Sequence, residues 1–449
     1  MKEHANSRIC RRNKKSKTIE SGRIRNNMKR IYRSVAAGIL ICAILMMTVG
    51  VQASVVENGA SYSISTNSIS EWPQGPDIYA ETAILMDADT GAILYNKGMD
   101  EKRYPASITK IMTCMLALEH SSLDEQVTFT ETCQGDQVAG SGNAGMQVGE
   151  VLTMRQCLLL LMIRSANDVA TQIAEHVGGS VEAFVDMMNQ KAQELGCMNT
   201  HFVNASGMPD DNHYSTAYDM ALIFREAIKN DTFREIIGTQ SFVIEPTNMN
   251  TETRSFSSHH PLVVRSAPEY YEGCFGGKTG VTDSAKNTLV SGAERNGMTL
   301  IAVTMRADEL GQLCQDQTNM FNYGFDNFSK VEVPGGYVTI PNGKDVTDLK
   351  VVETVSGDVT AEAYYYNDDY FVGTRVKEEP TPEEEMTSEI ISAEEPETEE
   401  PSGLSESEKQ QAEQNMKQLY QYIIYILAGL IGVALLISII SSIVKHKHR

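Results

Sequence analysis

Two long apolar segments, one near each end of the chain, limit where a folded body can form. Residues 35–51 are apolar and uncharged and follow a basic region, which is the pattern of a secretory signal peptide cleaved after Ala53. An uncleaved membrane anchor is the alternative, because about 17 residues is at the lower limit for a membrane span. Residues 423–444 are also apolar and precede the basic residues 445–449, which predicts a transmembrane helix with a cytoplasmic tail.

The distribution of charge indicates which side of the membrane the body occupies. The chain has a net charge of -21, although Lys and Arg outnumber acids by about ten in residues 1–34. The remainder is therefore strongly acidic, and this excludes nucleic acid as a natural partner. Because positive charge next to a membrane segment favours the cytoplasmic side, we expect the body to be extracellular.

Composition divides the region between the apolar segments into four parts. Residues 54–75 are polar and rich in Ser, which predicts a linker, and residues 76–327 have the size and hydrophobic patterning of a folded domain. Residues 328–376 are rich in Val, Thr and Tyr with alternating polarity, as in a small all-β domain. Residues 377–420 are rich in Glu, Pro, Ser and Thr, which predicts a disordered, self-repelling stalk.

Residues 76–327 mix strand and helix patterns. Two β-rich runs, Thr288 to Arg295 and Met298 to Met305, flank Asn296-Gly297, a pair typical of a tight hairpin. A second hairpin is predicted around residues 87–91. Helices are predicted from about Thr153, Val181, Ser215 and Leu310.

A serine and a lysine three residues apart, Ser107 and Lys110, begin an apolar helical pattern. On a helix these positions share a face, so the lysine amine can reach the serine hydroxyl. The hydroxyl is a poor nucleophile until a base removes its proton. An amine whose pKa is lowered by burial and nearby cations can be that base, which predicts a serine enzyme that acts by acyl transfer.

Two further motifs give this spacing its meaning. A serine and lysine at the same spacing also occur at Ser442 and Lys445 in the predicted membrane exit, so the pair alone proves nothing. Ser165-Ala-Asn167, however, follows a buried helical pattern, and Lys278-Thr-Gly280 precedes the β hairpin. The three motifs in this order are typical of penicillin-binding proteins and serine β-lactamases.

With these motifs, the chain resembles the serine-type D-alanyl-D-alanine carboxypeptidases among the low-molecular-mass penicillin-binding proteins. The resemblance extends over residues 76–376 and includes MDADTGAILYNKGMDEKRYPASITKIMT and GGKTGVTDSAKNTLVSGAERNGMTLIAV. It implies an α+β fold in which helices flank an antiparallel sheet, with the active site at one strand edge. The small β domain and a C-terminal transmembrane helix complete the expected architecture.

The resemblance also implies the catalytic roles. Ser107 is the expected acyl nucleophile, Lys110 its general base, and Ser165 the relay that returns a proton to the leaving amine. Asn167 is expected to hold the substrate amide. Lys278 adds positive charge that keeps Lys110 partly neutral.

The remaining expected site residues bind substrate. Thr279 and Gly280 belong to the strand edge, where Thr279 is expected to hold the terminal carboxylate. The backbone amides of Ser107 and Val281 would form the oxyanion hole. Arg306 is expected to be a carboxylate-binding arginine, or else a solvated residue at a strand end.

The expected substrate is the pentapeptide of peptidoglycan, from which the enzyme removes the terminal D-alanine. β-Lactam antibiotics are expected to acylate Ser107, and no metal or organic cofactor is implied. A β-lactamase on the same fold is one alternative, although no Glu-x-x-Leu-Asn stretch occurs in residues 201–219. A catalytically inactive wall-binding membrane protein is another, and endopeptidase or transpeptidase activity stays open.

Two other kinds of functional site have less support in the sequence. His176, His201 and His213 suggest a Ser-His-Asp triad, but the chain has no nucleophile-elbow motif. The glycine-rich run Gly140 to Gly145 lacks the Lys-Ser/Thr of a phosphate-binding loop and is interpreted as a surface loop.

Overall fold

The computed structural model describes Gly59 and residues 61–137, 141–333, 336–356, 359–367 and 369–376. The predicted signal peptide, stalk, transmembrane helix and tail lie outside these residues. In the part that is described, no helix is long and apolar enough to cross a membrane.

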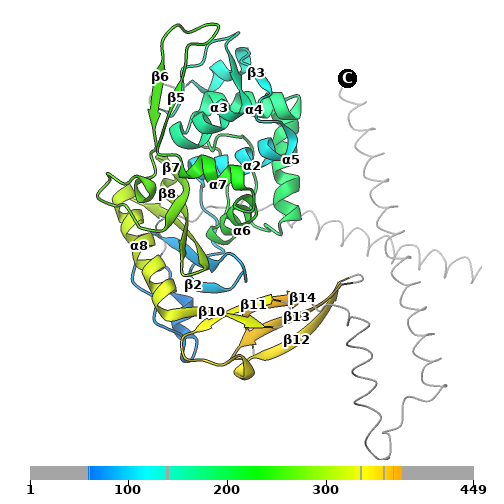
Figure 1. Cartoon of the computed structure of the whole chain (residues 1–449), viewed down its shortest axis with the longest axis vertical. Helices are drawn as coiled ribbons and strands as arrows, with labels where there is room; N and C mark the ends of the chain where they lie inside the picture. Colours follow the sequence, from blue (N-terminus) through cyan, green and yellow to red (C-terminus); the bar gives the residue numbers. More distant parts are fainter. Residues whose placement is uncertain are drawn as a thin grey trace, which may run out of the picture. The chain divides into compact units, whose positions relative to one another are not determined.

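The central sheet has five antiparallel strands in the order β2-β1-β9-β8-β7 (Figure 1). The predicted hairpin joins β8 to β9, and both turn residues, Asn296 and Gly297, have positive φ angles, as that turn requires. Strand β7 is at one edge of this sheet. The strands are β1 (Thr82–Asp87), β2 (Ile93–Lys97), β7 (Cys274–Thr282), β8 (Lys286–Arg295) and β9 (Met298–Ala307).

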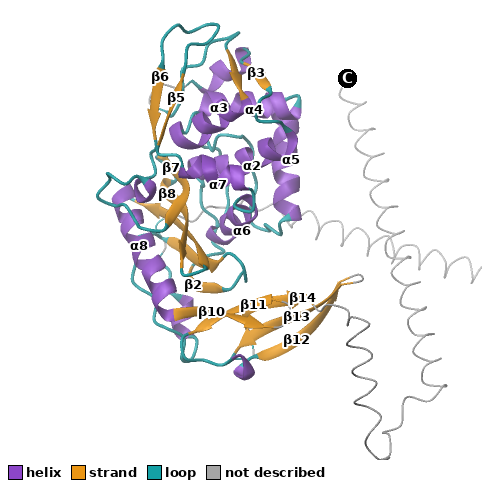
Figure 2. Ribbon diagram, viewed as in Figure 1, coloured by secondary structure: helices purple, strands orange, loops and turns teal. Residues whose placement is uncertain are grey.

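Side chains alternate between the two faces of the sheet, as the two-residue period of a strand dictates. In β1, Ile84 and Met86 join the hydrophobic cluster formed with the helical region, whereas Ala83 and Leu85 join the cluster on the other side. Helix α8 (Leu310–Asn327) packs on this second side (Figure 2). The sheet is therefore buried on both faces, which confirms the predicted α+β fold.

Helices form most of the layer on the first face of the sheet, opposite α8. They are α2 (Lys110–His120), α3 (Met154–Leu159), α4 (Asn167–Gly178), α5 (Val181–Glu194), α6 (Ala217–Ala227) and α7 (Asp231–Gly238). Thr153 forms a capping box at the start of α3, and Ser180 caps α5. Thr216, one residue after the predicted Ser215, caps α6. Helix α7, capped by Asn230, is absent from the sequence prediction.

Two small hairpins complete the catalytic domain. Strands β3 (Gln126–Thr128) and β4 (Val151–Thr153) pair beside the helices. Strands β5 (Ser241–Ile244) and β6 (Arg254–Ser257) form an arm that extends away from the central sheet (Figure 1).

The prediction of a linker at residues 54–75 is wrong for residues 61–75, which the structure describes. These residues contain a 3-10 turn, η1 (Ser65–Ser68), and Ile64 pairs with Lys97 of β2. Trp72 is 3% exposed and donates its indole N–H to the Leu94 carbonyl at 3.1 Å. The polar composition of this segment predicted a linker, although its few apolar residues pack against the sheet.

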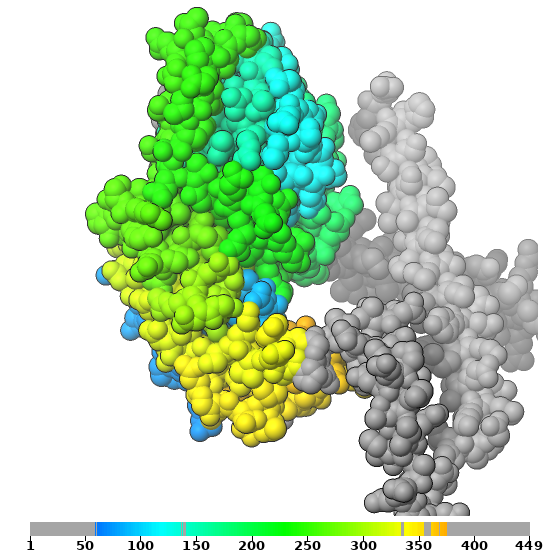
Figure 3. All heavy atoms as spheres, viewed as in Figure 1, coloured from blue at the N-terminus to red at the C-terminus, as the bar shows by residue number. Residues whose placement is uncertain are grey.

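The C-terminal sheet contains five strands in the order β10-β11-β14-β13-β12. Trp72 packs against the rings of Phe328, Tyr366 and Tyr370, and the Thr339 hydroxyl donates to buried Asp87 at 3.0 Å. This sheet therefore shares a hydrophobic cluster with the catalytic domain, and the two form a continuous surface in Figure 3. Its strands are β10 (Phe328–Val333), β11 (Gly336–Pro341), β12 (Lys350–Ser356), β13 (Val359–Tyr366) and β14 (Tyr370–Val376).

Candidate active site

Ser107 lies in a short 3-10 turn, η2 (Ala106–Thr109), that leads into helix α2. The sequence predicts a helix from Ser107, but the α-helix itself begins at Lys110. Ala106 has a φ of 52°, a left-handed conformation that is costly for a residue with a Cβ. A Cβ at Gly207 would lie 1.9 Å from the Ala106 carbonyl oxygen, so only glycine allows this loop to support the turn.

Lys110 is fully buried, and its amine reaches three oxygen atoms from separate segments. Its Nζ lies 3.0 Å from Ser107 Oγ, 2.7 Å from Asn167 Oδ1 and 2.5 Å from the Ser206 carbonyl oxygen. The amide and carbonyl oxygens only accept hydrogen bonds, whereas the serine hydroxyl can also donate. A neutral amine can therefore donate to both of these oxygens and use its lone pair to accept the Ser107 proton, as a general base does.

Ser165 and Asn167 stand at a break between two helices. The helical segment η4 (Leu160–Arg164) has π geometry and ends at Ser165, whose φ is 61°, and α4 begins at Asn167. A π-helical turn often marks a functional site. Ser165 lines the cleft, and its hydroxyl has no hydrogen-bond partner among the described residues. It is thus available to a ligand, while Asn167 contacts Lys110.

The loop before this break forms a second wall of the cleft. Buried Asp168 accepts hydrogen bonds from the backbone N–H groups of Ala144 and Met146, at 3.0 and 3.1 Å. The Asn167 N–H donates to the Gly142 carbonyl at 2.8 Å, and Ser141 and Gly142 line the cleft. Part of the glycine-rich run interpreted as a plain surface loop is therefore cleft wall.

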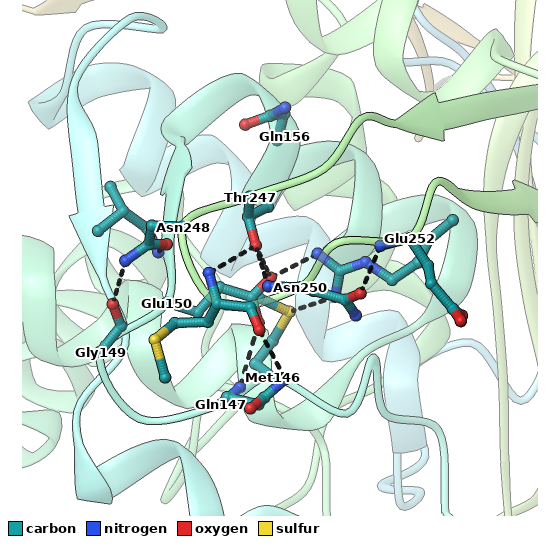
Figure 4. Close-up of polar contacts among 12 residues, drawn as sticks. Met146, Gln147, Gly149, Glu150, Gln156, Thr247, Asn248, Asn250 and Glu252 are labelled. Carbon is teal, nitrogen blue, oxygen red and sulfur yellow. Dashed lines mark hydrogen bonds and ion pairs between the residues drawn. The ribbon is translucent and has the colours of Figure 1, made fainter.

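A buried ion pair fixes the far end of this loop to the arm. Arg254 of β6 lies 2.5 Å from the Glu150 carboxylate. This carboxylate is fully buried and also accepts from Thr247 Oγ1 at 2.9 Å (Figure 4). Asn248 contributes two more bonds, to the Gly149 carbonyl and from the Val151 N–H. We call this group the Glu150 clamp.

Strand β7 brings the third motif beside the nucleophile. A Cβ at Gly280 would lie 2.8 Å from the Ser107 backbone nitrogen, so the strand and the turn approach this closely only at glycine. Lys278 is 1% exposed, and burial lowers its pKa to about 7. Its Nζ donates to the Thr279 carbonyl at 2.7 Å. Thr279, Gly280 and Val281 line the same cleft as Ser107.

Arg306 is not brought to this cleft. Its Nε donates to Glu81 Oε1 at 2.9 Å, and its guanidinium also donates to the Ser284 carbonyl. It lines a different pocket, together with Tyr79 and Lys286. The other eight predicted site residues lie in or directly beneath one cleft, and Arg306 alone among the nine lies elsewhere.

The histidines do not form a triad with Ser107. His213 is buried; its Nδ1 accepts from the Val203 N–H at 3.1 Å, so its Nε2 donates to Thr109 Oγ1 at 2.8 Å. Burial lowers the pKa of His213 to about 3, and it is therefore neutral at physiological pH. It supports the turn that carries the nucleophile instead of removing a proton.

The segments that carry the three motifs line a cleft of about 820 Å³. Among the described residues, no group of three or more His, Cys, Asp or Glu side chains is placed to hold a metal ion. A serine with a buried amine at hydrogen-bonding distance, on an α+β scaffold, defines a serine enzyme that acts by acyl transfer.

The chain belongs to the D-alanyl-D-alanine carboxypeptidase family, peptidase family S11, whose model matches residues 69–309. It is 34% identical over 253 residues to the D-alanyl-D-alanine carboxypeptidase DacF of Bacillus subtilis; the match covers 56% of this chain and 63% of that protein. It is 32% identical to a D-alanyl-D-alanine carboxypeptidase of Streptomyces strain K15, covering 56% of this chain and 88% of the relative.

Solved structures agree with this placement. The Streptomyces K15 DD-transpeptidase aligns with a TM-score of 0.53 and 32% identity, covering 57% of this chain and all of that one. Penicillin-binding protein 6B of Escherichia coli aligns with a TM-score of 0.57 and 26% identity, covering 69% of this chain and 98% of that one. The family resemblance inferred from the motifs is thereby confirmed.

Proposed function

We propose that this chain is a serine peptidase that removes the terminal D-alanine from peptidoglycan stem peptides through an acyl-serine intermediate. The observation that carries the proposal is the position of Lys110 Nζ, 3.0 Å from Ser107 Oγ and held by Asn167 and Ser206. The family membership supports the substrate class.

The proposed acylation uses each wall of the cleft. Lys110 accepts the Ser107 proton while Oγ attacks the carbonyl of the penultimate D-alanine. Backbone amides of Ser107 and Val281 stabilise the negative oxygen, and Ser165 passes a proton to the departing amine of the terminal D-alanine. Water then hydrolyses the Ser107 ester, which releases the shortened peptide and restores the free serine.

A β-lactam offers the same attack geometry but keeps its leaving amine attached through its fused ring. We therefore propose that β-lactams acylate Ser107 and leave slowly. Family members with solved structures carry names that include penicillin binding, which supports this expectation.

Transfer of the acyl group to an amine is a second candidate activity. The Streptomyces K15 protein, at 32% identity, is called a DD-transpeptidase. The two reactions share the acyl-serine intermediate and differ only in whether water or an amine attacks it.

One assay separates these activities. The full-length chain is incubated with a pentapeptide ending in D-alanyl-D-alanine, with and without added glycine as the amine acceptor, and both free D-alanine and peptide products are measured. Carboxypeptidase activity predicts D-alanine and tetrapeptide, and transpeptidation predicts a glycine-terminated peptide. Release of no D-alanine, together with rapid turnover of penicillin, would instead identify a β-lactamase.

We also propose that the catalytic body faces the cell wall from the outer side of the membrane. The support is the sequence pattern of residues 35–51 and 423–449, together with a substrate that is itself extracellular. Protease added to intact cells should cut the acidic stalk and shed an active body. A body that stays protected until the cells are lysed would refute this location.

A further inference from the structure

The cleft is lined mostly by neutral and basic side chains although the protein as a whole is acidic. Its rim contains Arg164 and His259, while Asp283 is the one acidic side chain among its described lining residues. Behind this rim lie the buried amines of Lys110 and Lys278. In a chain with a net charge of -21, an arginine at the cleft that no carboxylate among the described residues pairs with indicates that the ligand brings negative charge.

Arg164 and His259 line the cleft from two segments that are far apart in the sequence. Arg164 is the last residue of the π-helical segment, directly before Ser165, and His259 follows strand β6 at the base of the arm. Arg164 Nη1 lies 3.4 Å from His259 Nε2. Since arginine only donates, Nε2 is the acceptor, and the proton of the neutral imidazole is on Nδ1.

The pKa of His259 agrees with a neutral imidazole that accepts this hydrogen bond. Burial lowers its pKa, and Lys278 and Arg164 lower it further. A neutral His259 can accept the hydrogen bond and orient the guanidinium without competing with it for an anion.

No carboxylate among the described residues forms an ion pair with Arg164. Arg306 differs, because it forms an ion pair with Glu81, which also pairs with Arg103, and it donates to the Ser284 carbonyl in another pocket. For Arg306 to bind a ligand in the cleft, both contacts would have to break. Arg164 needs no such rearrangement.

We propose that Arg164, oriented by His259, binds the terminal carboxylate of the peptide and the equivalent carboxylate of a β-lactam. The inference rests on the proposed function, because it places this carboxylate beside Ser107 while the hydroxyl attacks the neighbouring carbonyl. A guanidinium matches a carboxylate with two parallel hydrogen bonds, which gives both strength and orientation. Arg164 thus supplies a contact that the sequence prediction assigned to Arg306, and His259 is a positioning residue.

The test compares benzylpenicillin with its methyl ester, which lacks the carboxylate charge, as acylating agents for the full-length chain. The parent should react faster with the acid. Arg164→Gln should lose about 10- to 100-fold in the second-order acylation rate for the acid, since hydrogen bonds to charged groups are the strong ones. Its rate with the ester should stay within about twofold of the parent, which also shows that the variant is folded.

Three variants make the result specific. Arg164→Lys should recover part of the preference for the acid, because it restores the charge without the planar fork. Arg265→Gln, a change at an exposed arginine outside the cleft, should leave both rates unchanged. Arg306→Gln should also keep the preference.

The outcomes separate two failures. If neither compound acylates Ser107 in the parent, the proposed function is wrong. If both acylate it but Arg164→Gln slows them equally, or if Arg306→Gln is the variant that abolishes the preference, the proposed role of Arg164 is wrong.

Discussion

Replacement of Glu150 by glutamine tests whether the Glu150 clamp stabilises the catalytic domain. The Glu150 side chain is 0% exposed and that of Arg254 is 15% exposed, so the pair is shielded from water. The Arg254 Nε already has no hydrogen-bond partner among the described residues. Glu150→Gln keeps the shape of the side chain but leaves the guanidinium buried without its counter-charge, which costs about 3 to 5 kcal/mol.

Urea unfolding of the full-length chain, followed by far-UV circular dichroism, measures this loss. With a slope of about 3 kcal/mol per molar urea, a loss of about 3 kcal/mol lowers the midpoint by about 1 M. Arg155→Gln is the matched control, since the Arg155–Glu235 pair is 40% and 60% exposed and is worth about 1 kcal/mol or less.

A third variant separates charge from packing. If Glu150→Leu is combined with Arg254→Met, both charges are removed together, and most of the lost stability should return. A midpoint for Glu150→Gln within about 0.3 M of the parent would refute the reasoning, because it would mean that the ion pair is solvated or unformed.

Three further predictions concern the strand edge, the buried lysine and the interface with the small sheet. Gly280→Ala should slow penicillin acylation at least about tenfold, because the new Cβ would lie 2.8 Å from the Ser107 nitrogen; Gly311→Ala, where nothing lies within 4 Å, is the control. The pKa of Lys278 falls from 10.5 to about 7 on folding, so between these values the unfolded chain binds more protons and the free energy of unfolding rises with pH. Lys278→Met should flatten this rise. If the free energy of unfolding rises with pH equally steeply in the variant, burial does not disfavour the charged form of Lys278. Truncation after Asn327 should shift the emission of Trp72, the one tryptophan of the chain, to longer wavelength, because its partners Phe328, Tyr366 and Tyr370 are lost; unchanged emission would contradict the shared core.

Local signals explain why so much of the fold is predictable. An Asn-Gly turn specifies its hairpin through its own backbone preferences, and the polar residues at Thr153 and Ser180 cap helices through bonds to N–H groups three residues away. The three motifs likewise predict the nucleophile and its walls, because each has a fixed residue pattern on a recognisable element.

Features that depend on distant partners could not be predicted in this way. Trp72 is buried against Phe328, Tyr366 and Tyr370, which lie more than two hundred residues later in the chain. Arg306 is held by Glu81, which lies directly before the neighbouring strand β1 and more than two hundred residues earlier in the chain. A residue's own sequence context does not reveal such a partner.

The cleft wall at Ser141 and Gly142 was missed for the same reason. Its placement depends on the Asp168 carboxylate and on the Asn167 N–H, both beyond the following helix. One signal was available: the acid directly follows the Ser165-Ala-Asn167 motif, where a carboxylate at a helix N-terminus can accept backbone hydrogen bonds.

Identification of the acylated residue tests the central claim most directly. The full-length chain is treated with benzylpenicillin, digested, and analysed by mass spectrometry, alongside Ser107→Ala and Ser165→Ala variants. The structure predicts one penicilloyl adduct on Ser107, its complete loss in Ser107→Ala, and a slower but detectable adduct on Ser107 in Ser165→Ala. An adduct on any other residue of the parent, or undiminished labelling of Ser107→Ala, would contradict the assignment of Ser107 as the nucleophile.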